Sequence, residues 1–88
     1  MKEFIFIIKD KNGLHARPAG LMATVAREFD SQIKVKSGNK EADGKRLLSL
    51  MSLGAKQGAT LSFEISGADE EAAKEALEGY CKEKLGGE

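Results

Sequence analysis

Turn-forming residues divide this chain into seven short segments, and that division limits the folds open to it. Four segments have the composition or the alternating pattern of strands, and three have the three-to-four-residue apolar spacing of amphipathic helices. The predicted strands are residues 2–8, 32–36, 40–43 and 59–66, and the predicted helices are residues 16–29, 45–54 and 69–85. The predicted order is therefore β-α-β-β-α-β-α.

The clearest strand is apolar on one face only. In residues 59–66, Leu61, Phe63 and Ile65 alternate with polar residues. A one-faced strand buries its apolar side against amphipathic helices and leaves its other side to solvent. The pattern predicts an α+β fold of two layers, with an antiparallel or mixed sheet that has helices on one face and solvent on the other.

The first strand is apolar on both faces, so its pattern leaves open which of its residues face the core. Ile5 or Ile7 on the open face of the sheet has two interpretations, ordinary exposed apolar surface or a weak dimer contact. We expect a monomer.

Length and charge narrow the class of protein. The 88 residues suffice for one small core, and the balance of 14 basic and 14 acidic residues argues against nucleic acid as a partner. No run approaches the ~18 apolar residues of a membrane span. The single cysteine, Cys81, cannot form an internal disulfide and has the spacing of a small buried residue. We expect a cytoplasmic protein without membrane insertion.

The one histidine and the one proline of the chain stand three positions apart. His15 directly precedes the predicted helix of residues 16–29, and Pro18 lies in its first turn, where a missing N–H breaks no hydrogen bond. The N–H groups of that turn attract anions, and Arg17 adds a permanent charge and a forked donor. The sequence thus predicts an imidazole beside a small anion-binding site.

An imidazole in this position suits phosphoryl chemistry. Histidine changes charge close to neutral pH, so much of it is present as the neutral, nucleophilic form. The helix end and Arg17 disfavour imidazolium and favour an attached phosphoryl dianion. The alternative is that His15 is an ordinary surface or capping residue, which is the commoner case. The sequence has neither the residue spacing of a metal site nor the motif of a serine nucleophile.

The stretch GLHARPA, Gly13 to Ala19, resembles the active-site signature of the histidine-containing phosphocarrier (HPr) family of the bacterial phosphoenolpyruvate-dependent sugar phosphotransferase system. Residues 51–77 are similar to the second signature region of that family, and the length agrees. The resemblance covers residues 1–88 as a single HPr-like domain. It implies an open-faced β-sandwich, with four antiparallel strands in the order 1-4-2-3 and three helices on one face.

The resemblance also implies a stoichiometric carrier rather than an enzyme. Enzyme I, charged by phosphoenolpyruvate, would place a phosphoryl group on Nδ1 of His15. The chain would then pass the group to a histidine of a sugar-specific enzyme II A component. Arg17 would neutralise the group, and the backbone of Ala16, Arg17 and Pro18 would receive it. No cofactor and no metal are implied.

The predicted helix of residues 45–54 carries more apolar residues than one buried face of so short a helix can hold. Two interpretations stay open from the pattern: all of these residues are core, or some form a docking surface for partners. By the resemblance, Leu50 and Leu53 face inward. The docking residues that the resemblance implies are Leu47, Leu48 and Met51. Leu21 lies one turn after Arg17 on the predicted helix of residues 16–29, and we expect it to extend this surface.

Arg46 stands where many members of the HPr family have a serine that a metabolite-controlled kinase phosphorylates. Arginine cannot accept that modification and caps a helix poorly, so we expect no regulatory serine, with Asp43 or Gly44 capping the helix instead. We do not expect such a kinase to phosphorylate Ser49 or Ser52 instead. Two other functions stay open: a regulatory module on the same fold, and a carrier in a parallel nitrogen-related relay.

Overall fold

The computed structural model describes residues 1–86, where the elements follow the predicted β-α-β-β-α-β-α order. The strands are β1 (Lys2–Ile7), β2 (Gln32–Ser37), β3 (Lys40–Asp43) and β4 (Thr60–Ser66), and the helices are α1 (Ala16–Ala26), α2 (Leu47–Met51) and α3 (Glu70–Lys84). These strands pair antiparallel in the order β1-β4-β2-β3, which confirms the expected order 1-4-2-3.

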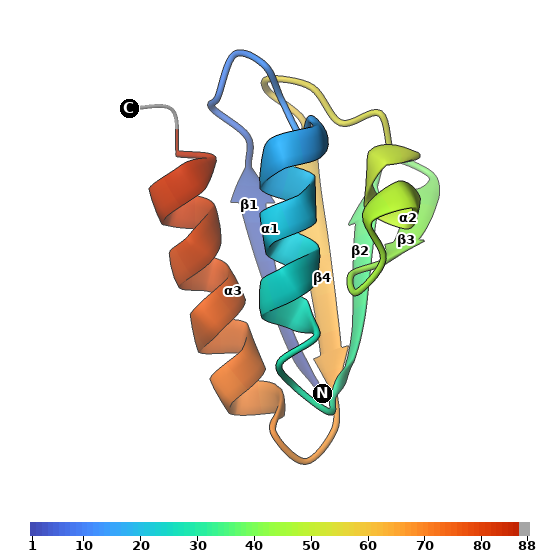
Figure 1. Cartoon of the computed structure of the whole chain (residues 1–88), viewed down its shortest axis with the longest axis vertical. Coiled ribbons are helices and arrows are strands. Elements are labelled where there is room, and N and C mark those ends of the chain that lie inside the picture. Colours follow the sequence, from blue (N-terminus) through green and yellow to red (C-terminus); the bar gives the residue numbers. More distant parts are fainter. Residues whose placement is uncertain (87–88) are drawn as a thin grey trace.

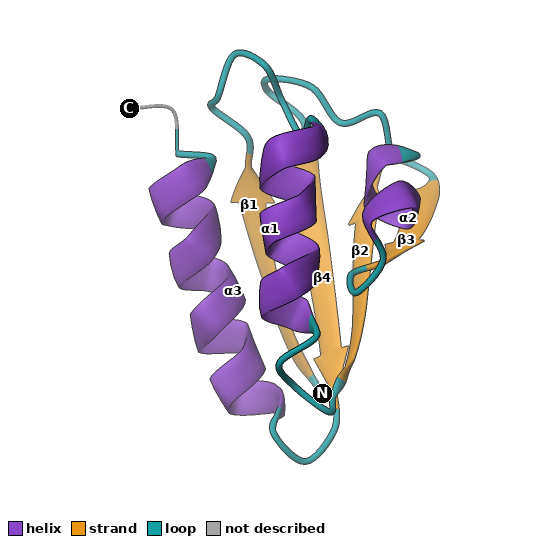
Figure 2. Cartoon of the chain, viewed as in Figure 1, coloured by secondary structure: helices purple, strands orange, loops and turns teal. Residues whose placement is uncertain are grey.

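The helices cover one face of the sheet. Helices α1 and α3 lie side by side over the long strands, and α2 lies beside α1 toward β3 (Figure 1). The strands form the second layer behind them (Figure 2). The start of α1, the loop that precedes it and the loop that follows α2 meet at one end of the molecule (Figure 1). The predicted two-layer arrangement is confirmed.

The core lies between the sheet and the helices, and it decides which face of β1 is inward. Phe63 of β4 is fully buried, and the Phe4 ring of β1 stacks on it with ring centres 4.4 Å apart. Ile8 is also buried, whereas Ile5 and Ile7 are 68% and 51% exposed on the opposite face of the sheet. The sequence pattern left open which residues of the first strand face the core. Phe4 and Ile8 face it, and Ile5 and Ile7 face away.

Helix α1 ends earlier than the sequence predicts, at Ala26 rather than Phe29. The N–H of Phe29 donates to the carbonyl of Ala26, three residues back, which is the spacing of a 3₁₀ turn. The next two N–H groups, of Asp30 and Ser31, donate to the carboxylate of Asp69 at 2.9 Å each. A helix continued through Phe29 would use the Asp30 N–H for the carbonyl of Ala26, so this tertiary contact competes with a longer α1.

Neither α2 nor α3 has a side-chain hydrogen bond at its N-cap residue, and the expected cap of α2 by Asp43 or Gly44 is wrong. Asp69 occupies the N-cap position of α3, but its side chain makes no capping hydrogen bond because the loop after α1 occupies the carboxylate. The N-cap of α2 is Arg46, also without a side-chain capping bond. Asp43 accepts the N–H of Lys45 at 2.9 Å instead of capping α2, and Gly44 donates its N–H to β2.

Candidate functional site

A tightly hydrogen-bonded loop brings the chain from β1 to His15. The N–H of Asn12 donates to the Asp10 carboxylate at 2.8 Å, and the N–H of Gly13 donates to the Asp10 carbonyl at 3.0 Å. Gly13 then adopts φ +67°, a conformation that glycine takes without strain. Leu14 is buried, and its N–H donates to the carbonyl of Ala55 at 3.0 Å. Leu14, the residue before the histidine, is therefore held both by its buried side chain and by its backbone N–H.

His15 is the N-cap residue of α1, with extended backbone angles, and its carbonyl accepts the N–H of Ala19 at 3.0 Å. Its imidazole makes no capping hydrogen bond and is exposed, while Pro18 in the first helical turn is buried. The first N–H groups of a helix have no partner within the helix, and those of Ala16 and Arg17 directly follow the histidine. An anion bound to the imidazole would meet these donors.

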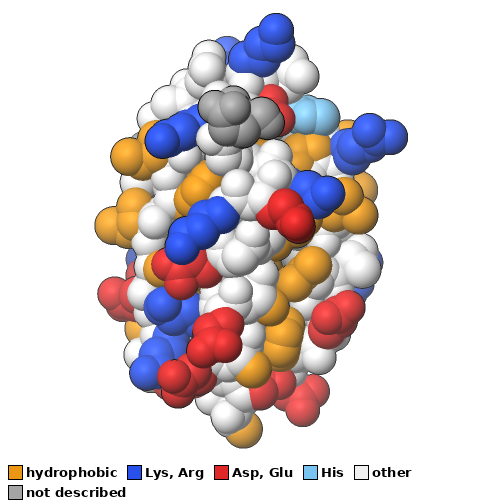
Figure 3. Space-filling model, turned by 90° about the vertical axis from the view of Figure 1, so that its left-hand side faces the viewer, with side chains coloured by type: hydrophobic (Ala, Val, Ile, Leu, Met, Phe, Trp, Pro, Cys, Tyr) orange, Lys and Arg blue, Asp and Glu red, His pale blue; other side chains and the backbone are white. Residues whose placement is uncertain are grey.

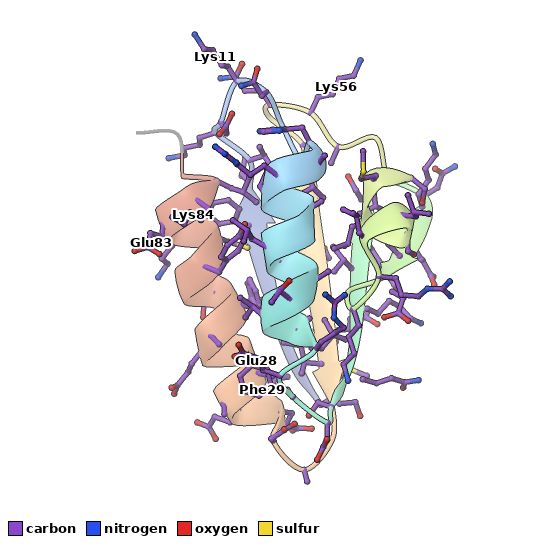
Figure 4. The ribbon with its side chains drawn as sticks, viewed as in Figure 1. Lys11, Glu28, Phe29, Lys56, Glu83 and Lys84 are labelled. Atoms are coloured by element: carbon purple, nitrogen blue, oxygen red, sulfur yellow. The ribbon has the colours of Figure 1, made fainter. Side chains whose placement is uncertain are left out.

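Cationic side chains lie on α1 and on the loops at this end of the molecule, together with the carboxylate of Asp10. Arg17 is exposed at the second position of α1, and the first turn contains no acidic residue. Lys11 and Lys56 extend from the two loops that flank the start of α1 (Figure 4). A view of one side of the molecule shows the histidine at the surface near this end (Figure 3). The positive end of the helix dipole and these cations together favour an anion here.

Tyr80 of α3 contacts the same turn from inside the protein, which the sequence reasoning missed. Its hydroxyl donates to the carbonyl of Pro18 at 2.7 Å. Burial, with a smaller contribution from Cys81, raises the pKa of Tyr80 to about 12. The hydroxyl is protonated at neutral pH, as in tyrosine generally, and acts as a donor. The available signal was that a buried tyrosine hydroxyl needs a hydrogen-bond partner, but the sequence does not say which.

Cys81 itself is fully buried on α3. Burial, and then the charge of Glu78, raises the pKa of the Cys81 thiol to about 12. A thiol protonated at neutral pH is a poor nucleophile, which agrees with its expected packing role.

The apolar residues of α2, with Leu53 just after it and Leu21 of the neighbouring α1, divide into two sets. Leu50 and Leu53 are buried, at 0% and 5% exposure. Four others, which we call the exposed leucine–methionine surface, are Leu21, Leu47, Leu48 and Met51, and Leu48 is 80% exposed. The two helices that carry this surface are close together, because a β-carbon at Gly20 would lie 3.9 Å from the Leu47 side chain. The interpretation that every apolar residue of α2 is core is wrong.

Comparison with known proteins identifies the family of the chain. The family model described as "PTS HPr component phosphorylation site" matches residues 2–83. The chain belongs to the HPr family. It is 41% identical to phosphocarrier protein HPr of Mycoplasma genitalium over 85 residues, which are 96% of each protein. A crystal structure of HPr from Thermoanaerobacter tengcongensis superposes with a TM-score of 0.92 at 44% identity, covering 100% of this chain and 99% of that one.

A longer protein also contains a region similar to this chain. The chain is 36% identical over 75 residues to the multiphosphoryl transfer protein of Escherichia coli O157:H7, a match that covers 82% of this chain and 20% of that protein. Within residues 1–86, no helix has the length and apolarity needed to cross a membrane.

Proposed function

We propose that this HPr-family chain is a stoichiometric phosphoryl carrier that receives a phosphoryl group from phosphorylated enzyme I on Nδ1 of His15. The proposal rests mainly on one observation, an exposed imidazole at the N-cap of α1 beside the free N–H groups of the first turn. The match of the family model over residues 2–83 and the core shared by all the elements support residues 1–88 as a single HPr-like domain.

The transfer is a simple displacement at phosphorus. The lone pair of Nδ1 on the neutral imidazole attacks the phosphorus, and the bond from phosphorus to the donor histidine of enzyme I breaks. The electron pair of that bond returns to the donor ring, which takes up a proton from water, while the Nε2 proton of His15 is released to water. The N–H groups of Ala16 and Arg17 and the Arg17 guanidinium then face the phosphoryl oxygens. The same step in the opposite sense gives the group to a histidine of a sugar-specific enzyme II A component.

The site suits a carrier because it stabilises the group only modestly. An exposed helix end contributes about 0.3–1 kcal/mol to a nearby anion. Arg17 is exposed as well, so water screens its charge. A carrier must give up the group as readily as it accepts it, so weak contacts are sufficient. We propose that the exposed leucine–methionine surface binds the partners, since its apolar area adjoins α1, the helix that carries the site.

Phosphorylation by enzyme I tests this function. The chain is incubated with phosphoenolpyruvate and enzyme I, and its mass is compared before and after acid treatment. We expect an acid-labile, alkali-stable gain of about 80 Da, the mass of one phosphoryl group. His15→Ala should abolish the gain, and Arg17→Ala should slow it while the fold is kept. A missing adduct, or one that persists in His15→Ala, would contradict the proposal.

A further inference from the structure

Two hydrogen bonds join Tyr80 to the backbone of His15 through a single peptide group. The Tyr80 hydroxyl donates to the carbonyl of Pro18 at 2.7 Å. The N–H of that same peptide belongs to Ala19, and it donates to the carbonyl of His15 at 3.0 Å. Because a peptide group is planar and rigid, holding its carbonyl also fixes the direction of its N–H.

The phenol is well placed to hold this peptide. Tyr80 is buried, and Leu77 and Cys81 beside it on α3 are fully buried. Helices α1 and α3 lie side by side (Figure 1), and Ala19 is fully buried. The donor hydroxyl is therefore attached to a packed part of the core rather than to a mobile surface chain.

The same end of α3 also holds the chain on the other side of His15. The N–H of Lys9 donates to the carbonyl of Leu85 at 3.0 Å, and Leu85 is fully buried. Lys9 begins the loop that leads to His15, and Pro18 follows His15 in the first turn of α1. The last turns of α3 therefore hold both ends of the segment that carries the imidazole.

The first turn of α1 needs such support. Helix ends fray, and the bond between Ala19 and His15 is the first backbone hydrogen bond of this helix. Fraying of this turn would move both the ring and the N–H groups that follow it. A donor on the Pro18 carbonyl also polarises the peptide group, which strengthens its N–H as a donor to His15.

We propose that Tyr80 is a positioning residue for phosphoryl transfer at His15. This inference rests on the proposed carrier function. The Tyr80 hydroxyl holds the first turn of α1 in the arrangement that the phosphoryl group requires. Tyr80 touches neither the imidazole nor the phosphoryl group in this account. Its effect reaches His15 through the Pro18–Ala19 peptide.

Tyr80→Phe tests the inference, because it removes the hydroxyl and keeps the ring in the core. In the full chain, we expect kcat for phosphorylation by enzyme I to fall about 3- to 10-fold, the factor that matches one lost hydrogen bond. KM should stay unchanged, since the exposed leucine–methionine surface is intact. Hydrogen exchange of the Ala19 amide should accelerate by a similar factor. The amide resonances of Ala16 and Arg17 should shift.

A matched control separates positioning from general stability. Ala73→Gly weakens α3 at a fully buried position four residues into the helix, at the end away from Tyr80. We expect this variant to lose stability while keeping wild-type kcat. If Ala73→Gly and Tyr80→Phe slow transfer equally, the effect is one of stability and the inference is overturned.

The outcomes also separate this inference from the carrier function. Phosphorylation of wild-type His15, with unchanged kcat and unchanged Ala19 exchange in Tyr80→Phe, would overturn the role of Tyr80 and leave the carrier function standing. A wild-type chain that enzyme I does not phosphorylate would overturn the carrier function, and the role of Tyr80 in transfer with it. Faster Ala19 exchange in the variant would then show only that the hydroxyl holds the turn.

Discussion

A β-carbon at Gly13 would lie 2.6 Å from the carbonyl oxygen of Ala55 and 2.8 Å from the α-carbon of Lys56. The positive φ of Gly13 adds a second barrier to any side chain there. We therefore expect Gly13→Ala to lower the free energy of unfolding by about 2–4 kcal/mol, the sum of backbone strain and overpacking. Urea unfolding followed by circular dichroism measures this change.

Gly38→Ala is the control for Gly13→Ala. Gly38 has nearly the same φ, +62°, but a β-carbon there meets nothing within 4 Å. Gly38→Ala should therefore lower the free energy of unfolding by only about 1 kcal/mol. The backbone strain causes this loss, and the lower flexibility of the unfolded chain offsets part of it. Equal losses for the two variants would show that the contact with Ala55 is unimportant.

Leu48 and Leu50 are two residues apart on α2 but differ in exposure, 80% against 0%. Leu48→Ala should change stability by less than about 0.5 kcal/mol. It should raise KM for phosphorylation by enzyme I by about 5- to 30-fold, the cost of truncating a central interface contact. Leu50→Ala should lose about 2–5 kcal/mol of stability. An unchanged KM in Leu48→Ala would exclude Leu48 from partner binding.

Asp69 makes stability depend on pH in the acid range. The Ser31 hydroxyl, then the N–H groups of Asp30 and Ser31, hold the pKa of the Asp69 carboxyl below its ordinary 3.8. The unfolded chain takes up the proton at higher pH than the folded chain does. The stabilisation is therefore complete above the ordinary pKa and is lost as pH falls toward the lower, folded value.

Asp69→Asn should therefore flatten the acid branch of the stability curve. Thermal unfolding between about pH 6 and about pH 2 measures this, because the linkage acts only across the two pKa values. We expect Tm of the variant to be lower at neutral pH and to approach wild type at the acid end. Glu75→Gln, which removes an exposed carboxylate from the same helix, should leave the curve unchanged. Parallel curves for wild type and Asp69→Asn would contradict this assignment.

Arg46→Ser should stabilise α2. Arg46 places a cation at the N-terminus of this helix, and it makes no side-chain capping bond. A serine hydroxyl accepts N–H groups of the first turn, so we expect a gain of about 0.5–1 kcal/mol in the free energy of unfolding. Equilibrium urea unfolding of the two chains checks this, and a loss of stability would contradict it.

Kinase treatment of the wild type and Arg46→Ser tests the prediction that the native chain has no regulatory serine. The hydroxyls near Arg46 are already engaged, since Ser49 Oγ accepts the Asp43 N–H and Ser52 Oγ donates to the Ser49 carbonyl. With an HPr serine kinase, mass spectrometry should find phosphoserine only in the variant. Phosphoserine at Ser49 or Ser52 of the wild type would overturn the prediction.

The fold was largely predictable because its signals are local. The alternation of Leu61, Phe63 and Ile65 and the turn residues between segments depend on neighbours in the sequence. The boundaries that the sequence missed depend on distant contacts instead. Helix α1 stops at Ala26, and a longer α1 would compete with the bonds of the following chain to Asp69, about forty residues away.

The site was predictable in part for the same reason. His15, Arg17 and Pro18 are adjacent in the sequence, so their meeting at a helix start follows from local pattern. The supports of that turn are not local, since Tyr80 is 62 residues from Pro18. Pairing of that kind is set by how α1 and α3 pack, which periodicity does not specify.

Magnetic resonance of the phosphorylated chain tests the central claim most directly. Phosphorus and nitrogen spectra, recorded after treatment with phosphoenolpyruvate and enzyme I, identify the atom that carries the phosphoryl group. We predict a bond to Nδ1 of His15, with the largest amide shifts at Ala16 and Arg17. A phosphoryl group on Nε2 or on another residue, or amides at the start of α1 that do not respond, would contradict the account.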